Sequence, residues 1–193
     1  MKTNVYIDGF NLYYGCLRKT PYKWLDLGAL VSRLLPKDEI NRIRYFTAHV
    51  SGRGGDHQQP QRQQIYLRAL ATIPNLSVHL GQFLTHPTRM PLANPGSGPA
   101  TVEVLKTEEK GSDVNLATYL LLDAFEKDCE AAAVISNDSD LALPIELAMK
   151  KLGLVVGVIN PHPSGHRSRR LRSAFFADPG GGTEGMPVSG HDE

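Results

Sequence analysis

A short apolar run that stops abruptly at small polar residues constrains the fold of this chain more than any other feature. Residues 131–135 are all apolar, the next five read SNDSD, and a helical pattern follows from Leu141 to Leu152. This succession is typical of a buried parallel strand that leads into its crossover helix. The same layout occurs near the N-terminus, where residues 4–7 end in Asp8-Gly9-Phe10-Asn11. Ligands of open α/β sheets bind at the carboxyl ends of the strands, so both turns are candidate site segments.

The rest of the chain alternates between strand and helix patterns. Helices are predicted from Asn11 onward, over 26–35, 60–73 and 114–125 (with Ser112 as N-cap of the last), and over 141–152. Strands are predicted at 5–7, 40–50, 76–84, 101–106, 131–136 and 154–159, with Val78, Leu80 and Phe83 of the third pointing inward. A final helix or edge element is predicted at 167–176. This alternation predicts a mostly parallel sheet with helices on both faces.

Prolines recur at every fourth position between Thr85 and Ala100, namely Pro87, Pro91, Pro95 and Pro99. No helix or central strand tolerates this spacing. We therefore expect an excursion there, the tip of a hairpin or arm around 85–105, and an added arm of this kind often mediates self-association. Residues 1–177 are expected to form one domain, and the glycine-rich residues 178–193 a flexible tail.

Charge is unevenly distributed, although the net charge is only +1. Eleven of the twenty acidic residues lie between Glu103 and Glu146, whereas residues 147–177 contain six lysines and arginines and no acid. An acidic centre beside a basic flank suits a metal site with an anionic substrate, although solvated helix faces give similar charge runs. Cys16 and Cys129 fit neither a zinc motif nor a disulfide framework, and no apolar run reaches membrane length, so a cytoplasmic protein is expected.

Four aspartates are predicted to gather at one edge of the sheet: Asp8, Asp113, Asp138 and Asp140. Each could be only a helix cap, an explanation that is stronger for Asp113 and Asp140 than for Asp8 and Asp138. Like charges brought together raise each other's pKa unless a cation neutralises them. Carboxylate oxygens select Mg²⁺ or Mn²⁺, and the chemistry that follows is attack of a metal-activated water on a phosphodiester.

Three segments in order, Tyr6-Ile-Asp8-Gly-Phe-Asn11, Glu109-Lys-Gly-Ser-Asp113-Val114 and Ser136-Asn-Asp138-Ser-Asp140, resemble the NYN domain, a branch of the PIN-like nucleases. The resemblance covers residues 2 to about 176. It implies a three-layer α/β/α fold and metal-dependent ribonuclease activity, with the four aspartates as metal-binding acids and RNA as substrate. It also implies that Asn11 and Ser136 support the cluster.

The predicted phosphate contacts are basic residues near the acids. Lys110 is placed to meet a phosphate, although it could only pair with Glu109. The further candidates on the basic flank are Arg167, Arg169, Arg170 and Arg172, which could equally solvate a terminal helix.

Several alternatives remain at this stage. Asp138-Ser-Asp140 also has the form of a Toprim site, although that fold would place a glutamate where this chain has Asp8. A non-catalytic RNA-binding or regulatory module on the same fold is the rival from another class. Phe10, Tyr13, Tyr14 and Trp24 could stack on bases, although aromatic residues at such positions are more often core. His162 and His166 could touch phosphate, but isolated surface histidines are the more common case.

Overall fold

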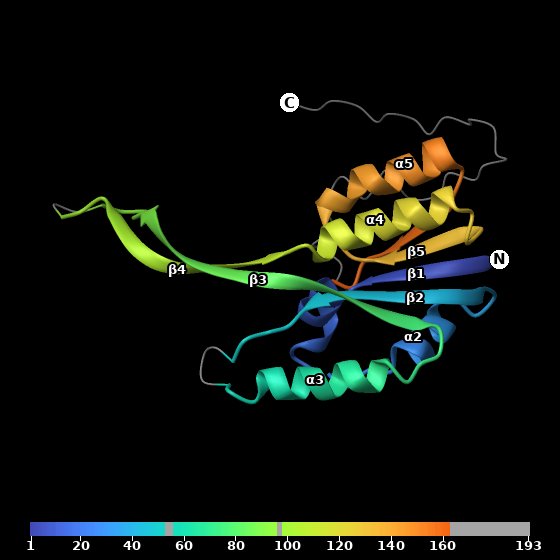
Figure 1. Cartoon of the computed structure of the whole chain (residues 1–193), viewed down its shortest axis with the longest axis horizontal. Helices are drawn as coiled ribbons and strands as arrows, with labels where there is room; N and C mark the ends of the chain where they lie inside the picture. The colour runs from blue at the N-terminus through green and yellow to red at the C-terminus, as the bar shows by residue number, and fades with distance from the viewer. Residues whose placement is uncertain (53–55, 96–97, 163–193) are drawn as a thin grey trace, which may run out of the picture.

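The computed structural model describes residues 1–52, 56–95 and 98–162, and in these residues a curled six-stranded sheet forms the centre of the molecule (Figure 1). The strands are β1 (Lys2–Asp8), β2 (Glu39–Ala48), β3 (Leu76–Pro91), β4 (Thr101–Lys110), β5 (Ala131–Ile135) and β6 (Val155–Ile159). The helices are α1 (Gly9–Leu12), the π-helix η1 (Tyr13–Leu17), α2 (Leu27–Leu34), α3 (Gln59–Leu70), α4 (Ser112–Phe125), the 3₁₀ helix η2 (Ser139–Leu141) and α5 (Ala142–Leu152).

The order of the strands places β1 at the point where the direction of winding reverses. The order is β4-β3-β2-β1-β5-β6, and every pairing is parallel except that of β3 with β4. Strand β1 therefore lies between β2, which follows it in sequence, and β5, which comes more than a hundred residues later. The prediction of an α/β fold with a mostly parallel sheet is confirmed.

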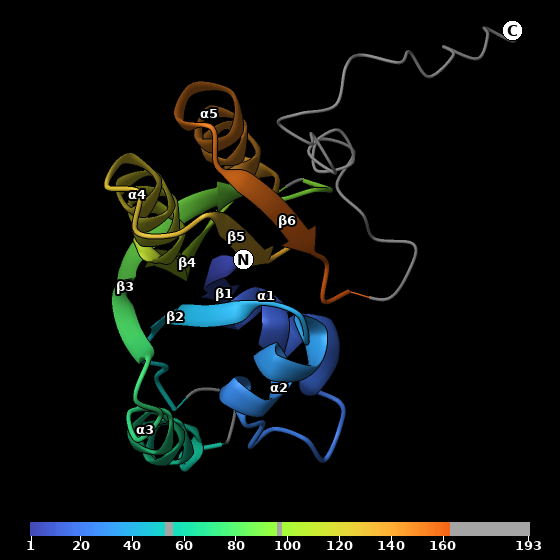
Figure 2. The same ribbon diagram turned by 90° about the vertical axis from the view of Figure 1, so that its right-hand side faces the viewer.

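Helices pack on both faces of this sheet (Figures 1 and 2). On one face α4 and α5 bury Leu116, Leu120 and Ile145 against Tyr6 of β1. On the other face α1, α2 and α3 pack against Val5 and Ile7 of the same strand. The period-two alternation of β1 thus supplies side chains to both cores, as expected for a central strand.

A buried polar cluster ties β1, β2 and α4 together between these layers. Asp123 of α4 accepts a 2.7 Å hydrogen bond from the Tyr6 hydroxyl and a bidentate pair, 2.8 and 2.7 Å, from Arg44 of β2. Burial, and then the bond to Asp123, raise the pKa of Tyr6 far above its usual range. Arg44 also lies over the ring of Tyr119, 4.4 Å from its centroid. Because its partners are all supplied by the fold, we interpret Asp123 as structural.

Strand β3 continues beyond the parallel sheet and forms an arm with β4 (Figure 1). Pairing of β2 with β3 ends at Ala48 opposite Gly81, while β3 and β4 remain paired from Gln82 opposite Lys110 to Pro91 opposite Thr101. The prediction of irregular chain from Thr85 onward was wrong in its extent, because residues 85–91 belong to β3. Proline is tolerated on an edge strand, and in the described residues β3 has no neighbour but β4 there.

Two other predictions about local structure need correction. Leu80, predicted to point inward, is 44% exposed because it lies in an open depression between α3 and β3. Ser112 is not the N-cap of α4. The cap is Gly111, at φ +101°, and Ser112 is the first helical residue.

Cys16 and Cys129 are both free thiols. In the described part of the chain, no helix has the length and apolar character needed to cross a bilayer.

Gly81 marks the point where the arm leaves the sheet, and we predict that replacing it with alanine destabilises the protein. A Cβ at this position would meet the Glu109 carboxylate and would lie 2.6 Å from the carbonyl oxygen of Lys110. Overpacking of this kind costs typically about 1–3 kcal/mol, and we expect the free energy of unfolding of Gly81→Ala to fall by that amount in guanidinium titrations. Gly157→Ala is the matched control, because a Cβ there meets nothing within 4 Å. Equal effects of the two substitutions would contradict the prediction.

Candidate functional site

The turns after β1 and β5 meet at the reversal of strand order, where ligands bind in open α/β sheets. Ile7 is paired with Ile135, so the residues that follow, Asp8 at the end of β1 and Ser136 just after β5, lie side by side. The Ser136 hydroxyl donates a 2.9 Å hydrogen bond to Asp8 Oδ2, and both residues are buried. Both positions hold small polar residues, which end the apolar runs of the two strands.

Asp8 is a buried carboxylate whose oxygens both have partners. Its Oδ1 accepts a 2.9 Å bond from the backbone N–H of Asn11 and so caps α1, while Oδ2 accepts from Ser136. Burial raises the pKa of Asp8 above its ordinary value, and the charge of Asp138 raises it further, while these hydrogen bonds oppose the shift. The hydroxyl of Ser136 contacts Asp8 directly, and its support of a metal-binding cluster stays a prediction.

Ser136 also connects Asp8 to Asp138. Its Oγ accepts a 3.0 Å bond from the Asp138 backbone N–H, and Asp138 Oδ1 in turn accepts a 2.9 Å bond from the N–H of Asp140. Asp138 is therefore the N-cap of η2, which corrects our expectation that Asp140 was the stronger candidate for that role. An N-cap residue has an extended backbone, and Asp138 (ψ 126°) has this conformation directly before η2.

Asp113 enters the site from a third element, the first turn of α4. Its pKa is raised to about 7, first by burial and then by the charges of Asp8, Asp138, Glu109 and Asp140. The four predicted aspartates are thus close enough to act on one another electrostatically. Because α4 follows the arm rather than β1 or β5, this acid reaches the sheet edge from a separate part of the chain.

Glu109 is a further acid of the site that sequence reasoning did not assign to it. Its Oε1 accepts from the Ser112 backbone N–H at 3.1 Å, and its Oε2 accepts from the Ser112 hydroxyl at 2.8 Å. Glu109 therefore fixes the start of α4 from the end of β4. The only sequence signal was a glutamate three residues before a serine at a helix start, which is the reverse of the usual capping order.

Lys110 pairs with Glu108, at 3.6 Å, rather than with Glu109, and its side chain is more than half exposed. A contact of Lys110 with phosphate stays a prediction. The predicted phosphate contacts Arg167, Arg169, Arg170 and Arg172 lie outside the described residues, as does the predicted element at 167–176.

Asn11 holds the turn after β5 in place. Its Oδ1 accepts a 3.0 Å bond from the Asn137 backbone N–H and lies 3.0 Å from His162 Nε2. Because a backbone N–H already donates to this atom, it is the amide oxygen, and His162 must donate from a protonated Nε2. The amide of Asn11 thus connects the turns after β1 and β5, and its support of a metal-binding cluster stays a prediction. The role of His162 was missed, since nothing in the sequence connects it with Asn11, 151 residues away.

The donor set fits a hard divalent cation by its chemistry. Carboxylate oxygens are the ligands that Mg²⁺ and Mn²⁺ prefer, and a cation would relieve the repulsion that raises the pKa of Asp113. In residues 1–52, 56–95 and 98–162, however, no three histidine, cysteine or acidic side chains stand close enough together to hold a metal ion. The aspartates are gathered at the edge without forming a closed coordination sphere.

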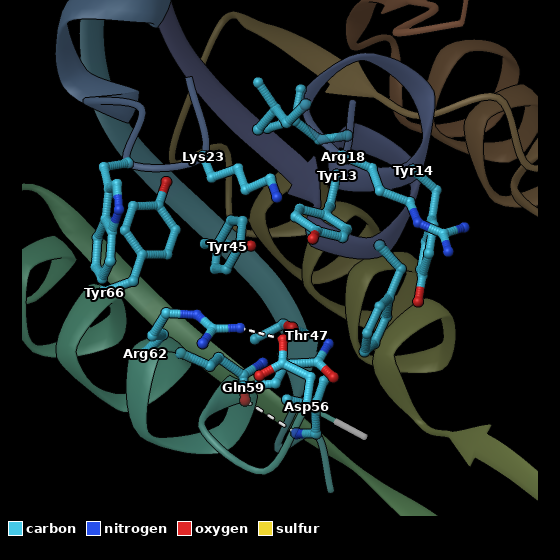
Figure 3. Close-up of a pocket in the computed structure, with 17 residues that line it drawn as sticks. Tyr13, Tyr14, Arg18, Lys23, Tyr45, Thr47, Asp56, Gln59, Arg62 and Tyr66 are labelled. Carbon is cyan, nitrogen blue, oxygen red and sulfur yellow. Dashed lines mark hydrogen bonds and ion pairs between the residues drawn. The ribbon is translucent and has the colours of Figure 1, made fainter. Parts of the chain in front are cut away.

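A cavity of about 400 Å³ lies at the turn that follows Asp8, on the face covered by α1, α2 and α3 (Figure 3). Gly9 and Phe10, the residues after Asp8, form part of its wall. The four aromatic residues considered above as stacking surfaces all line it, namely Phe10, Tyr13, Tyr14 and Trp24. The sequence could not show that Tyr45 and Tyr66 join them from β2 and α3.

Comparisons with known proteins agree with this architecture. A family model described as NYN domain matches residues 2–178. The chain is 32% identical to 6-hydroxy-3-succinoylpyridine 3-monooxygenase HspA of Pseudomonas putida, over 92% of this chain and 65% of that protein. The chain thus spans about two thirds of the length of this relative. A solved structure of a protein of unknown function from Vibrio parahaemolyticus has a TM-score of 0.53 at 19% identity, covering 90% of this chain and 88% of that one, which supports the fold alone.

The raised pKa of Asp113 predicts how the stability of the metal-free protein depends on pH. A carboxyl whose pKa is higher in the folded than in the unfolded state binds its proton more tightly when folded, so stability falls as pH rises from about 4 to about 7. Asp113→Asn removes this contribution. We expect the variant to gain stability relative to the wild type across that range and to keep a constant advantage above it.

Urea unfolding at a series of pH values measures this difference. Glu103→Gln, which removes an exposed acid on the arm, is the control, and its curve should run parallel to that of the wild type. A constant difference between Asp113→Asn and the wild type from pH 4 to 8 would contradict the raised pKa of Asp113.

Proposed function

The chain belongs to the NYN domain family, and on this premise we propose that it is a metal-dependent endoribonuclease that hydrolyses RNA phosphodiester bonds. The observation that carries the proposal is that Asp8, Asp113 and Asp138 come from three separate elements to one edge of the sheet, where burial first and then the neighbouring carboxylates raise the pKa of Asp113. Such a cluster costs stability without a cation, and a site for a divalent ion explains why it is kept. The PIN-like three-layer arrangement and a cytoplasmic location belong to the same proposal.

In this mechanism Asp8, Asp113, Asp138 and Asp140 would hold a Mg²⁺ or Mn²⁺ ion. The ion, when bound, supplies an activated water for attack on the phosphodiester and neutralises charge at the phosphate. Asn11 and Ser136 keep the turns after β1 and β5 in register, so that Asp8 and Asp138 face the same space. Lys110 and the arginines at 167, 169, 170 and 172 would contact phosphates of the RNA.

Protonation of Asp113 has a role of its own in this scheme. Burial and the neighbouring charges raise the pKa of its carboxyl to about 7, so this carboxyl keeps a proton at higher pH than an ordinary aspartate before any cation is present. Cation binding would then release a proton from this residue. Calorimetric titration of the protein with Mg²⁺ in buffers of different ionisation enthalpy measures that release independently of catalysis.

A second candidate is chemistry on a small aromatic acid, the kind of compound after which the Pseudomonas putida relative is named. One observation favours it, the aromatic cavity with cationic residues in its wall. The carboxylate cluster has no part in that alternative.

A non-catalytic RNA-binding or regulatory module, or a Toprim-like enzyme, would each keep some of the acids, but only the ribonuclease proposal uses all four.

The first test is substitution of Asp138 with asparagine. Asn can still cap η2, so the fold should be kept, and loss of one charge from a repelling cluster should raise the melting temperature of the metal-free protein slightly. Cleavage of a mixed RNA pool with Mn²⁺ should be abolished. Asp26→Asn is a matched control, because Asp26 caps α2 in the same way and lies outside the cluster. Cleavage that persists in excess chelator would exclude the metal mechanism.

The second test concerns the basic flank. Replacing Arg169 and Arg170 with alanine should weaken RNA binding and reduce the dependence of affinity on salt, by a slope of roughly one for each lost phosphate contact. Turnover at saturating RNA should change much less, because these contacts are made equally in the ground and transition states. Filter-binding titrations over a range of salt concentrations measure the slope. An unchanged affinity and slope would show that these arginines only solvate the chain.

A further inference from the structure

We infer that the cavity beside Asp8 binds one base of single-stranded RNA, with the phosphate of that nucleotide near Lys23. The inference rests on the ribonuclease function proposed above and adds to it a subsite for a nucleotide next to the carboxylate cluster. It is carried by three properties of the cavity, namely its aromatic walls, its positive charge and its shared turn with Asp8.

The inner wall is a fixed set of aromatic rings. Tyr66 meets Tyr45 edge to face at 6.4 Å and Trp24 at 6.2 Å, and its hydroxyl donates a 2.8 Å bond to the Leu25 carbonyl. At the rim, Tyr14 and Trp24 are each 54% exposed. Half-exposed aromatic rings around a cavity are a poor arrangement for a core and a good one for stacking on a planar ligand.

The charge of the cavity selects an anionic ligand. Three cations, Arg18, Lys23 and Arg62, line it against a single acid, Asp56, which pairs with Arg62. Arg18 lies over the Tyr14 ring, 5.4 Å from its centroid. Lys23 makes no hydrogen bond or ion pair within the described residues, and Figure 3 shows it directed toward the rings of Tyr13 and Tyr45. An ammonium group beside aromatic faces matches a nucleotide, which combines an aromatic base with a phosphate.

The position of the cavity connects it with the candidate active site. Gly9 follows Asp8 and lies so close to Tyr45 that a Cβ would come within 2.6 Å of that ring. One short turn therefore carries Asp8 on one side and the cavity wall on the other. A nucleotide with its base in the cavity would place the neighbouring phosphate of the same strand toward Asp8.

The size of the cavity restricts the kind of RNA. About 400 Å³ is at the small end of the range for ligand sites and suits a single nucleotide. A base that enters such a space must leave its stack, which costs least in a single strand. The expected substrate is therefore a single-stranded segment, with sequence-tolerant stacking as the main contribution to binding.

Trp24 provides a direct test, because it is the single tryptophan of the chain and lies in the cavity wall. Its fluorescence is followed in the presence of chelator while a mononucleotide, a short single-stranded RNA or the same RNA as a duplex is added. We expect a saturable change with the first two and a much weaker response to the duplex. Ribose 5-phosphate, which lacks the base, and benzoate, a planar anion without ribose or phosphate, should bind far less well.

Substitutions assign the signal to the cavity. Lys23→Ala and Tyr14→Ala should each weaken mononucleotide binding about tenfold, which corresponds to about 1.4 kcal/mol and is within the range for one stacked base. Their matched controls are Lys19→Ala and Tyr22→Ala, since both residues are exposed, close in sequence and outside the cavity wall. The controls should bind like the wild type.

The outcomes separate this inference from the proposed function. No saturable change with any nucleotide, equal binding of benzoate, or equal effects of the cavity and control substitutions would overturn the inference, and RNA cleavage with Mn²⁺ would still stand on its own. Saturable nucleotide binding without any cleavage would instead support the cavity as a nucleotide site and contradict the ribonuclease assignment.

Discussion

The hydrogen bond from Ser136 to Asp8 is the contact on which the geometry of the candidate site depends. It joins the turns that follow β1 and β5, two strands that are neighbours only because the order of the sheet reverses at β1. Asn11 adds a second connection between the same turns through the backbone of Asn137. These bonds position Asp8 and Asp138 before any ligand arrives, so the geometry of the edge is set by the fold.

Two of the aspartates cap helices, and this explains how a repelling cluster can persist in a folded chain. Asp8 and Asp138 each cap a helix, so part of the cost of bringing their charges together is offset by hydrogen bonds to backbone N–H groups. Asp113, by contrast, is not the cap of its helix, and burial and the neighbouring charges raise its pKa to about 7. A cap role observed in the structure therefore does not exclude the proposed role of the same residue as a cation ligand.

Local patterns in the sequence were sufficient to predict the alternation of strands and helices and the acids at their ends. The apolar run at 131–135 and its polar stop determine β5 and the turn after it, because both signals act within a few residues. Contacts between distant segments could not be predicted in the same way. Glu109 capping α4, His162 against Asn11, and Tyr66 facing Tyr45 each depend on how separate elements pack. The extent of β3 was misjudged because prolines exclude a central strand but not an edge.

The arm formed by β3 and β4 is connected with the helix that carries Asp113. Its base lies where Gly81 passes against Glu109, and Glu109 holds the first turn of α4, which carries Asp113. Because Glu109 at the end of β4 binds the first helical residue of α4, a tilt of the arm would act on the start of that helix. The far end of the arm lies tens of ångströms from the sheet by the rise of its strands. A ligand that displaced this end would therefore change the position of the Asp113 carboxylate relative to the other acids.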